Sequence, residues 1–233
     1  MSAPILVFDL DDTLYLERDF ARSGFEAASA CLADAADRGR FAERCLAILD
    51  EGGRGRIFDR ALAAQGLTAT PDLVARLVES YRDHDPDIAL AADVRRYLSG
   101  RDGRWRGALI TDGPAATQEA KIRALSLREV LGCVVCTGAL GPGFGKPHPR
   151  SFEIVEAWAG AGAGSLVYVA DNPTKDFVTP RARGWTTIEI RRPERIHRKP
   201  APDRHHQAHA AIESFADLDR CLEALGTRTI LAV

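Results

Sequence analysis

The chain has 233 residues, of which 45% are hydrophobic and 27% charged, and this mixture excludes disordered and fibrous proteins. Its 31 basic and 33 acidic residues leave a net charge of −2, without the basic surplus of a nucleic-acid-binding protein. No apolar run approaches the roughly 20 residues that span a bilayer, no secretory signal is visible, and the five cysteines are scattered. We therefore expect a cytoplasmic protein with free thiols and with neither a membrane nor a nucleic-acid partner.

Short apolar runs predict the strands of a parallel sheet. The first opens the chain and stops abruptly at Asp9, and four more follow after residue 100. Helical patterns separate the later runs, and this alternation predicts a parallel sheet with right-handed crossovers. The fold class expected is α/β, a doubly wound three-layer core. The predicted strands are 4–8, 107–110, 133–136, 166–170 and 185–190, and the predicted helices of this part are 114–125, 149–158 and 175–183.

The segment 16–99 breaks the alternation, because its apolar spacing is helical throughout. Thr70 followed by Pro71 reads as an N-cap and first helical residue. Some 80 residues are too many for a crossover connection. We expect a helical domain at 16–99, inserted into a core formed by 1–15 and 100–233.

The C-terminal part contains a polar stretch and one more helix. The stretch 191–210 includes a basic run and four histidines, and we expect it to be a solvated surface loop. A final helix is predicted from Ser214 to Gly226.

The first strand ends in Asp9-Leu10-Asp11-Asp12-Thr13. In extended backbone Asp9 and Asp11 point the same way, and two adjacent carboxylates repel unless a cation or a shared proton relieves them. Mg²⁺ prefers such oxygen ligands. Taken alone, the pair is equally compatible with a helix N-cap cluster.

The other strand ends favour a functional site. Thr111, Asp112 and Gly113 follow the second strand and offer a hydroxyl and backbone amides at a helix start, as anion sites do. Lys146 is the one charged residue of the loop after the third strand, in a chain with four lysines. Ligands of open parallel sheets bind beyond the carboxyl ends of the strands. The fourth strand adds Asp171 and Asp176, and the combined groups suit a phosphoryl group with its metal.

These motifs resemble the haloacid dehalogenase superfamily of phosphohydrolases. Its four motifs occur in order over residues 4–176, as DLDDT, Thr111, Lys146 in GKPHP, and DNPTKD. The inserted helical segment after the first motif also matches the position of a cap domain in that superfamily. The fourth motif departs slightly, since alanine precedes Asp171 where glycine is commoner, and we expect little consequence.

The resemblance implies a role for each motif residue. Asp9 would be the nucleophile and form an aspartyl-phosphate, and Asp11 would protonate the leaving alkoxide and then deprotonate the attacking water. Thr111 and Lys146 would bind phosphate oxygens. Mg²⁺ would be held by the side chains of Asp9 and Asp171 and by the Asp11 backbone carbonyl, with Asp176 a further ligand or an orienting group.

Two features bear on the substrate. An acid at position 11 favours phosphate esters, because the dehalogenase branch lacks it. Asp112, where relatives often have asparagine, either tunes substrate choice or caps the following helix, and capping is the favoured interpretation; Gly113 beside it supplies backbone amides to the substrate.

In the helical insert, Arg54 and Arg56 flank glycines and could hold an anionic part of the substrate; a solvated turn is the favoured alternative. Tyr15, Glu17 and Arg18, at the start of the insert, are candidates for the site entrance.

The sequence thus predicts a Mg²⁺-dependent phosphatase of a small metabolite, in the sugar phosphate or nucleoside monophosphate class. The alternatives are a phosphomutase of the same superfamily and a receiver-like signalling module phosphorylated on aspartate. The presence of Asp11 and of an insert argues against the receiver. The sequence does not indicate the substrate or the oligomeric state.

Overall fold

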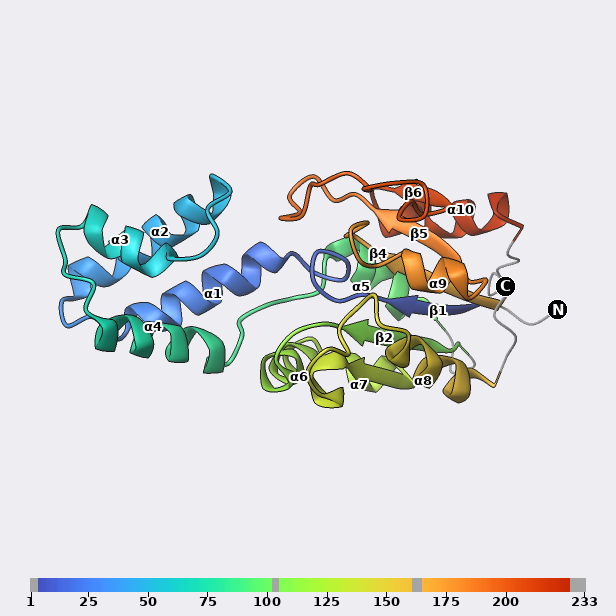
Figure 1. Ribbon diagram of the computed structural model, residues 1–233, viewed down its shortest axis with the longest axis horizontal. Helices are drawn as coiled ribbons and strands as arrows, with labels where there is room; N and C mark the ends of the chain where they lie inside the picture. The colour runs from blue at the N-terminus through green and yellow to red at the C-terminus, as the bar shows by residue number, and fades with distance from the viewer. Residues whose placement is uncertain (1–3, 102–104, 161–164, 227–233) are drawn as a thin grey trace. The chain divides into compact units, whose positions relative to one another are not determined.

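The computed structural model describes residues 4–101, 105–160 and 165–226. The chain divides into two compact units, one formed by residues 1–16 and 89–233 and the other by residues 17–88 (Figure 1). Each unit is described by itself below. No helix among the described residues has the length and apolar composition that a bilayer span requires.

The first unit is built on six parallel strands in the order β3-β2-β1-β4-β5-β6 (Figure 1). The chain winds outward from β1 to β3 and then, beginning with β4, outward on the other side, so β1 and β4 are central neighbours. This confirms the predicted doubly wound α/β class and the five predicted strands. The strands are β1 (Ile5–Phe8), β2 (Gly107–Thr111), β3 (Cys133–Cys136), β4 (Leu166–Ala170), β5 (Thr186–Ile190) and β6 (Ala210–Ile212).

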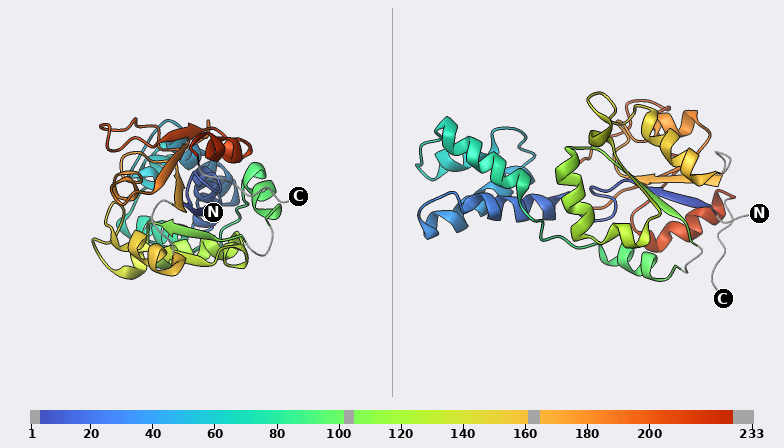
Figure 2. Two further views of the ribbon diagram at one scale, coloured as in Figure 1. Left: turned by 90° about the vertical axis from the view of Figure 1, so that its right-hand side faces the viewer. Right: turned by 90° about the horizontal axis from the view of Figure 1, so that it is seen from below.

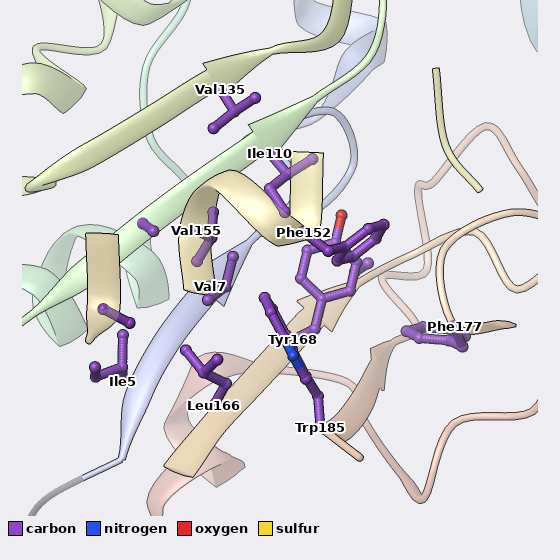
Figure 3. Close-up of a cluster of buried hydrophobic side chains, with 13 residues drawn as sticks. Ile5, Val7, Ile110, Val135, Phe152, Val155, Leu166, Tyr168, Phe177 and Trp185 are labelled. Carbon is purple, nitrogen blue, oxygen red and sulfur yellow. The ribbon is translucent and has the colours of Figure 1, made fainter. Parts of the chain in front are cut away.

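Helices cover both faces of this sheet (Figure 2). Because side chains alternate along a strand, Ile5 and Val7 join an apolar cluster to which α8 (Arg150–Ala159) contributes Phe152 and Val155, shown in Figure 3. Phe8 points to the opposite face and packs on Phe215, with ring centroids 5.7 Å apart. The remaining helices among the described residues of this unit are α5 (Ala92–Ser99), α6 (Ala115–Ala124), α7 (Leu127–Val130), α9 (Val178–Ala182), α10 (Leu218–Ala224) and the 3₁₀ turns η1 (Thr137–Leu140) and η3 (Phe215–Asp217).

The second unit is entirely helical and has its own apolar core. It contains α1 (Glu17–Ser29), α2 (Ala35–Asp50), α3 (Ile57–Ala64) and α4 (Pro71–Asp83). Phe25, Phe41, Leu62 and Leu77 are among its buried residues. The predicted start of α4 is confirmed, because the Thr70 hydroxyl accepts a hydrogen bond from the Leu73 amide and Pro71 is the first helical residue.

The division of the chain differs from the expected one at α5. This helix was expected within the insert, but it belongs to the first unit. Its Val94 and Leu98 are buried, and the Asp93 carboxylate accepts hydrogen bonds from the Ser214 hydroxyl and the Phe215 amide. The helical spacing of 92–99 resembles that of the insert, and only long-range contacts assign it to the core.

The C-terminal segment is more ordered than its polar composition suggested. It contributes β6, a short edge strand that the sequence did not predict. Arg192, expected in a solvated loop, is buried, and its guanidinium donates two hydrogen bonds to the Thr13 carbonyl and one to Asp93. An arginine in a basic run is buried here because each side of its guanidinium meets an acceptor.

Candidate active site

Three aspartates from two strand ends form a buried cluster. Asp9 follows β1 and Asp171 follows β4, and the Asp9 amide donates to the Val169 carbonyl at 2.9 Å, so sheet pairing itself sets the two side by side. Asp176 comes from the loop after β4, where its carboxylate accepts a hydrogen bond from the Asn172 amide at 3.1 Å. One carboxylate oxygen from each aspartate lies within 4.8 Å of the others, and all three residues are buried.

This cluster fits a hard divalent cation. Burial raises the pKa of Asp171 well above its usual range, and the Asp9 and Asp176 charges raise it further. Burial also raises the pKa of Asp9, to about 6, although the Lys146 ammonium opposes it. The Asp171 Oδ2 atom is buried and has no hydrogen-bond partner in the described part of the chain. Crowded, partly unsatisfied carboxylates are the donor set that Mg²⁺ prefers.

Lys146 neutralises part of this charge. Its Nζ lies 2.6 Å from Asp9 Oδ1, 2.8 Å from Asp176 Oδ1 and 3.0 Å from the Tyr168 hydroxyl. The ammonium donates hydrogen bonds to Asp9 and Tyr168 and forms an ion pair with Asp176. Burial lowers the pKa of Lys146, but the charges of Asp176 and Asp9 outweigh it and raise this pKa well above its usual value. The Tyr168 ring belongs to the apolar cluster of Figure 3, so its hydroxyl approaches the lysine from the core.

The Asp11 carboxylate lies outside the aspartate cluster. The Tyr15 hydroxyl and the Lys121 ammonium donate to Oδ1, the latter at 2.7 Å, and the Gln118 amide donates to Oδ2 at 3.1 Å. Burial raises the pKa of Asp11, but the Lys121 charge and these hydrogen bonds lower it below its usual range. The side chain of Asp11 is therefore not one of the clustered metal ligands, and the role expected of its backbone carbonyl stays a prediction.

Thr111 and Gly113 occupy the end of β2. The Thr111 hydroxyl is buried and accepts a hydrogen bond from the Gln118 side chain. Gly113 has a φ of 131°, which favours glycine. A Cβ on Gly138 would lie 2.2 Å from the Gly113 carbonyl oxygen, so the turns after β2 and β3 touch through their backbones.

Asp112 does not cap the helix that follows it. Pro114 is the N-cap residue of α6, and no side chain caps that helix. The Asp112 carboxylate instead accepts hydrogen bonds from the Thr137 hydroxyl at 2.8 Å, the Lys146 amide at 3.0 Å and the Lys175 ammonium at 2.9 Å. The capping interpretation is wrong because a hydroxyl, a backbone amide and an ammonium from two other loops bind this carboxylate instead. Burial opposes ionisation, but Lys146 and Lys175 lower the pKa of Asp112 below its usual range.

Arg54 and Arg56 belong to the helical unit and are exposed. The Arg54 guanidinium donates to the Gly53 carbonyl at 2.9 Å, and Arg56 pairs with Asp59 at 3.1 Å. Their contact with a substrate stays a prediction.

The site includes residues that sequence reasoning did not assign to it. Gln118 and Lys121 contact Asp11, Tyr168 contacts Lys146, and Lys175 contacts Asp112. One feature of the sequence could have identified two of them: lysine is rare in this chain, with four among 31 basic residues. Lys121, Lys146 and Lys175 all lie here, so the scarcity that marked Lys146 also marked the other two.

Comparison with models of known protein families assigns the chain to a family. A family model described as a hydrolase, haloacid dehalogenase-like, matches residues 4–181. The chain belongs to the haloacid dehalogenase-like hydrolase family. The matched residues span every strand end that contributes to the aspartate and lysine cluster, so the resemblance seen in the motifs is confirmed.

Among curated relatives of this hydrolase are two phosphatases. A glyceraldehyde 3-phosphate phosphatase of Methanocaldococcus jannaschii is 27% identical over 79% of this chain and 83% of that protein. A phosphoserine phosphatase of Thermus thermophilus is 28% identical over 60% of this chain and 55% of that protein. Relatives of this kind support phosphatase activity in the chain.

Solved structures match the whole fold at low identity. The HAD-hydrolase YfnB of Bacillus subtilis superimposes with a TM-score of 0.66 at 16% identity, over 95% of this chain and 99% of that one. A 2-haloacid dehalogenase of Pseudomonas syringae gives 0.61 at 21% identity, over 96% and 100%. Because phosphatases and dehalogenases share this fold, the chemistry of the site decides between them.

Proposed function

We propose that this hydrolase is a Mg²⁺-dependent phosphatase that cleaves a small phosphorylated metabolite through an aspartyl-phosphate on Asp9. The observation that carries the proposal is the buried Asp9 carboxylate, held 2.6 Å from the Lys146 ammonium and beside Asp171 and Asp176. A nucleophile, an ammonium and a cation site in one place are what transfer of a phosphate dianion requires.

In the first step an Asp9 oxygen attacks phosphorus, and the bond between phosphorus and the ester oxygen breaks. Lys146 stays beside the attacking carboxylate and stabilises the charge that develops on the phosphoryl oxygens, and the Thr111 hydroxyl binds one of them. Because the Lys146 side chain is wholly buried, water does not screen this interaction.

Asp11 would supply the proton that the departing alkoxide needs. Against the effect of burial, Lys121 and its hydrogen bonds lower the pKa of Asp11 in the free site, and the negative charge of a bound phosphate would raise it again. In the second step Asp11 takes a proton from water, which attacks the phosphorus of the aspartyl-phosphate and releases inorganic phosphate and free Asp9. Alkoxides are poor leaving groups, so an acid at this position suits esters and has no use in cleavage of a carbon–halogen bond.

Asp9, Asp171 and Asp176 would hold Mg²⁺, with the Asp11 carbonyl as a further ligand. When bound, the cation supplies charge neutralisation between the carboxylates and the phosphate. The structure of YfnB was obtained with bound magnesium, which supports this choice of metal.

The substrate proposed is a small phosphate monoester, of the sugar phosphate or nucleoside monophosphate class. Both curated relatives carry names that specify phosphorylated metabolites of three carbons. The helical unit 17–88 would serve as a cap that excludes water during turnover, with Arg54 and Arg56 as candidate substrate contacts.

The proposal is tested with purified protein and a panel of phosphorylated metabolites. Released phosphate is measured with and without Mg²⁺, for the wild type and for Asp9→Asn. We expect multiple turnovers that require Mg²⁺ and a loss of at least about 10⁴-fold in Asp9→Asn, because the uncatalysed reaction is extremely slow.

The matched control is Asp72→Asn, which makes the same change at a carboxylate on α4 that is 90% exposed. Turnover that persists in Asp9→Asn contradicts the aspartyl-phosphate. Stoichiometric labelling without release favours the receiver-like module, and movement of phosphate between hydroxyls of one sugar favours the phosphomutase.

A further inference from the structure

We propose that Gln118 and Lys121 are positioning residues that hold the Asp11 carboxyl group at the leaving-group oxygen of the substrate. Both side chains project from α6, one turn apart, and no role for either is part of the function proposed above. The inference rests on that function, since it assumes that Asp11 is the group that serves the leaving oxygen.

Lys121 and Gln118 contact different oxygens of the Asp11 carboxylate. Lys121 Nζ lies 2.7 Å from Asp11 Oδ1, and Gln118 Nε2 lies 3.1 Å from Asp11 Oδ2. Lys121 therefore pairs with one oxygen and Gln118 approaches the other, both from one rigid helix, so rotation of the carboxylate would lose at least one of these contacts. The Tyr15 hydroxyl adds a donor to Oδ1 from the loop that carries Asp11 itself.

Gln118 also joins Asp11 to the end of the second strand. The same Nε2 lies 2.5 Å from the Thr111 hydroxyl oxygen and 2.6 Å from the Asp112 carbonyl oxygen. The two hydrogens of this amide are shared among three oxygens, and the amide thus contacts both an Asp11 oxygen and the hydroxyl that is proposed to bind phosphate. The spacing between these two groups is set by Gln118 rather than by either strand alone.

Burial of Gln118 and Lys121 costs stability, because polar groups lose their hydration. Lys121 is 5% exposed and Gln118 is 1% exposed. A buried ion pair is seldom more stabilising than apolar residues of similar size, because both ions lose their hydration. We therefore infer that these two residues are kept for the orientation they give to the Asp11 carboxylate and not for stability.

Positioning of this kind has a signature in the leaving group. A p-nitrophenolate leaves without a proton, whereas an alkoxide needs one as its bond to phosphorus breaks. A displaced Asp11 therefore slows the first step of alkyl phosphates much more than that of p-nitrophenyl phosphate, and kcat/KM reports this step. The second step, in which Asp11 deprotonates water, is common to both substrates and enters kcat alone. Damage to the fold, to the nucleophile or to the metal site slows both substrates alike.

The experiment compares kcat and KM for p-nitrophenyl phosphate and for an alkyl phosphate that the wild type hydrolyses, in Lys121→Met and Gln118→Leu. We expect kcat/KM on the alkyl phosphate to fall about 10- to 100-fold and kcat/KM on p-nitrophenyl phosphate to fall less than about 3-fold. The loss is smaller than the roughly 10²–10⁴-fold that general acid catalysis supplies in full, because Asp11 itself is kept. Lys121→Arg, which keeps a cation within reach of Asp11, should recover most of the alkyl phosphate activity.

Two controls separate the possible failures. Lys199→Met makes the same chemical change at an exposed lysine outside the site and should leave both rates unchanged. In the double variant Asp11→Asn with Lys121→Met, the selective loss should not exceed that of Asp11→Asn alone, because the two residues act as one unit.

Equal losses in kcat/KM on the two substrates in both Lys121→Met and Gln118→Leu would overturn the inference, as would wild-type values of kcat/KM in both. If Asp11→Asn is selective for the alkyl phosphate and the α6 variants are not, the inference fails and the proposed function stands. If Asp11→Asn is itself not selective, the acid role of Asp11 fails and the inference fails with it.

Discussion

Asp112 takes its role from its neighbours and not from its place before a helix. Its carboxylate joins three loops, through Thr137, the Lys146 amide and the Lys175 ammonium. It also places one negative charge beside the groups that are proposed to receive a phosphate dianion. A carboxylate in this position competes with the substrate for the same donors.

Replacing Asp112 with asparagine tests this competition. Asp112→Asn keeps an acceptor for Thr137 and for the Lys146 amide but removes the charge. We expect inorganic phosphate to inhibit about 2- to 5-fold more strongly, since one charge at a partly exposed site contributes about 0.5–1 kcal/mol. The measurement is the inhibition constant of phosphate, with Asp72→Asn as the control. An unchanged or weaker inhibition would show that Asp112 does not compete with phosphate.

At the scale of elements, the loop after β1 is held by the segment after β5. The Arg192 guanidinium donates to the Thr13 carbonyl at 3.1 and 3.0 Å, and the Ile196 amide donates to Asp12 Oδ2 at 2.6 Å. Asp12 has a φ of 53°, a conformation that aspartate tolerates better than most residues do. Arg192 also pairs with Asp93 on α5 at 3.2 Å, so three separate segments meet at this loop.

The ion pair between Asp93 and Arg192 at this loop predicts that the stability of the fold depends on pH. Burial raises the pKa of Asp93, but the Phe215 amide and the Arg192 charge outweigh it and lower the pKa below its usual range. A lowered pKa in the folded state contributes stability above the unfolded value of about 3.9, and this stability is lost as the pH falls through the folded value. We therefore expect Asp93→Asn to lower Tm at pH 7 and the difference from wild type to shrink below about pH 4.

The measurement is Tm by calorimetry across this range, with Asp72→Asn as the control for loss of one carboxylate. A difference between wild type and Asp93→Asn that stays constant down to pH 3 would mean that the charge of Asp93 is not what stabilises the junction.

At the scale of the whole molecule, the two units have separate apolar cores. The cluster around Val7 and Phe152 belongs to the first unit, and the cluster around Phe41 and Leu77 belongs to the helical unit. The three tryptophans, at 105, 158 and 185, all lie in the first unit. Tryptophan fluorescence therefore reports on one core alone, whereas far-UV circular dichroism reports on both.

We expect Leu77→Ala to destabilise the helical unit selectively. Leu77 is fully buried, and such truncations cost about 2–5 kcal/mol. The helical circular dichroism signal should then begin to fall at a lower temperature, with a smaller shift in the fluorescence transition. Leu222→Ala, a matched truncation in the first unit, should shift the fluorescence transition instead. Coincident shifts of both probes in Leu77→Ala would show that the units unfold together.

Local pattern determined much of this protein. Apolar runs of four or five residues marked β1 to β4, because strands covered on both faces need continuous apolar sequence, and the mixed run 185–190 marked β5. The order of strands and helices implied a doubly wound sheet, whose carboxyl edge is where ligands bind, and so Asp9, Asp171 and Asp176 could be assigned to one site before any coordinates were known. The edge strand β6, with three residues, was too short to give such a signal.

Tertiary structure decided the contacts between polar groups. Nothing in the spacing of α6 shows that Gln118 and Lys121 face Asp11, more than 100 residues away, or that Asp112 binds Lys175 instead of capping its own helix. Such contacts depend on which buried donor lies nearest to which acceptor, and burial makes an unmet polar group costly. The sequence indicates which side chains need partners, and only the packed fold determines which partners they find.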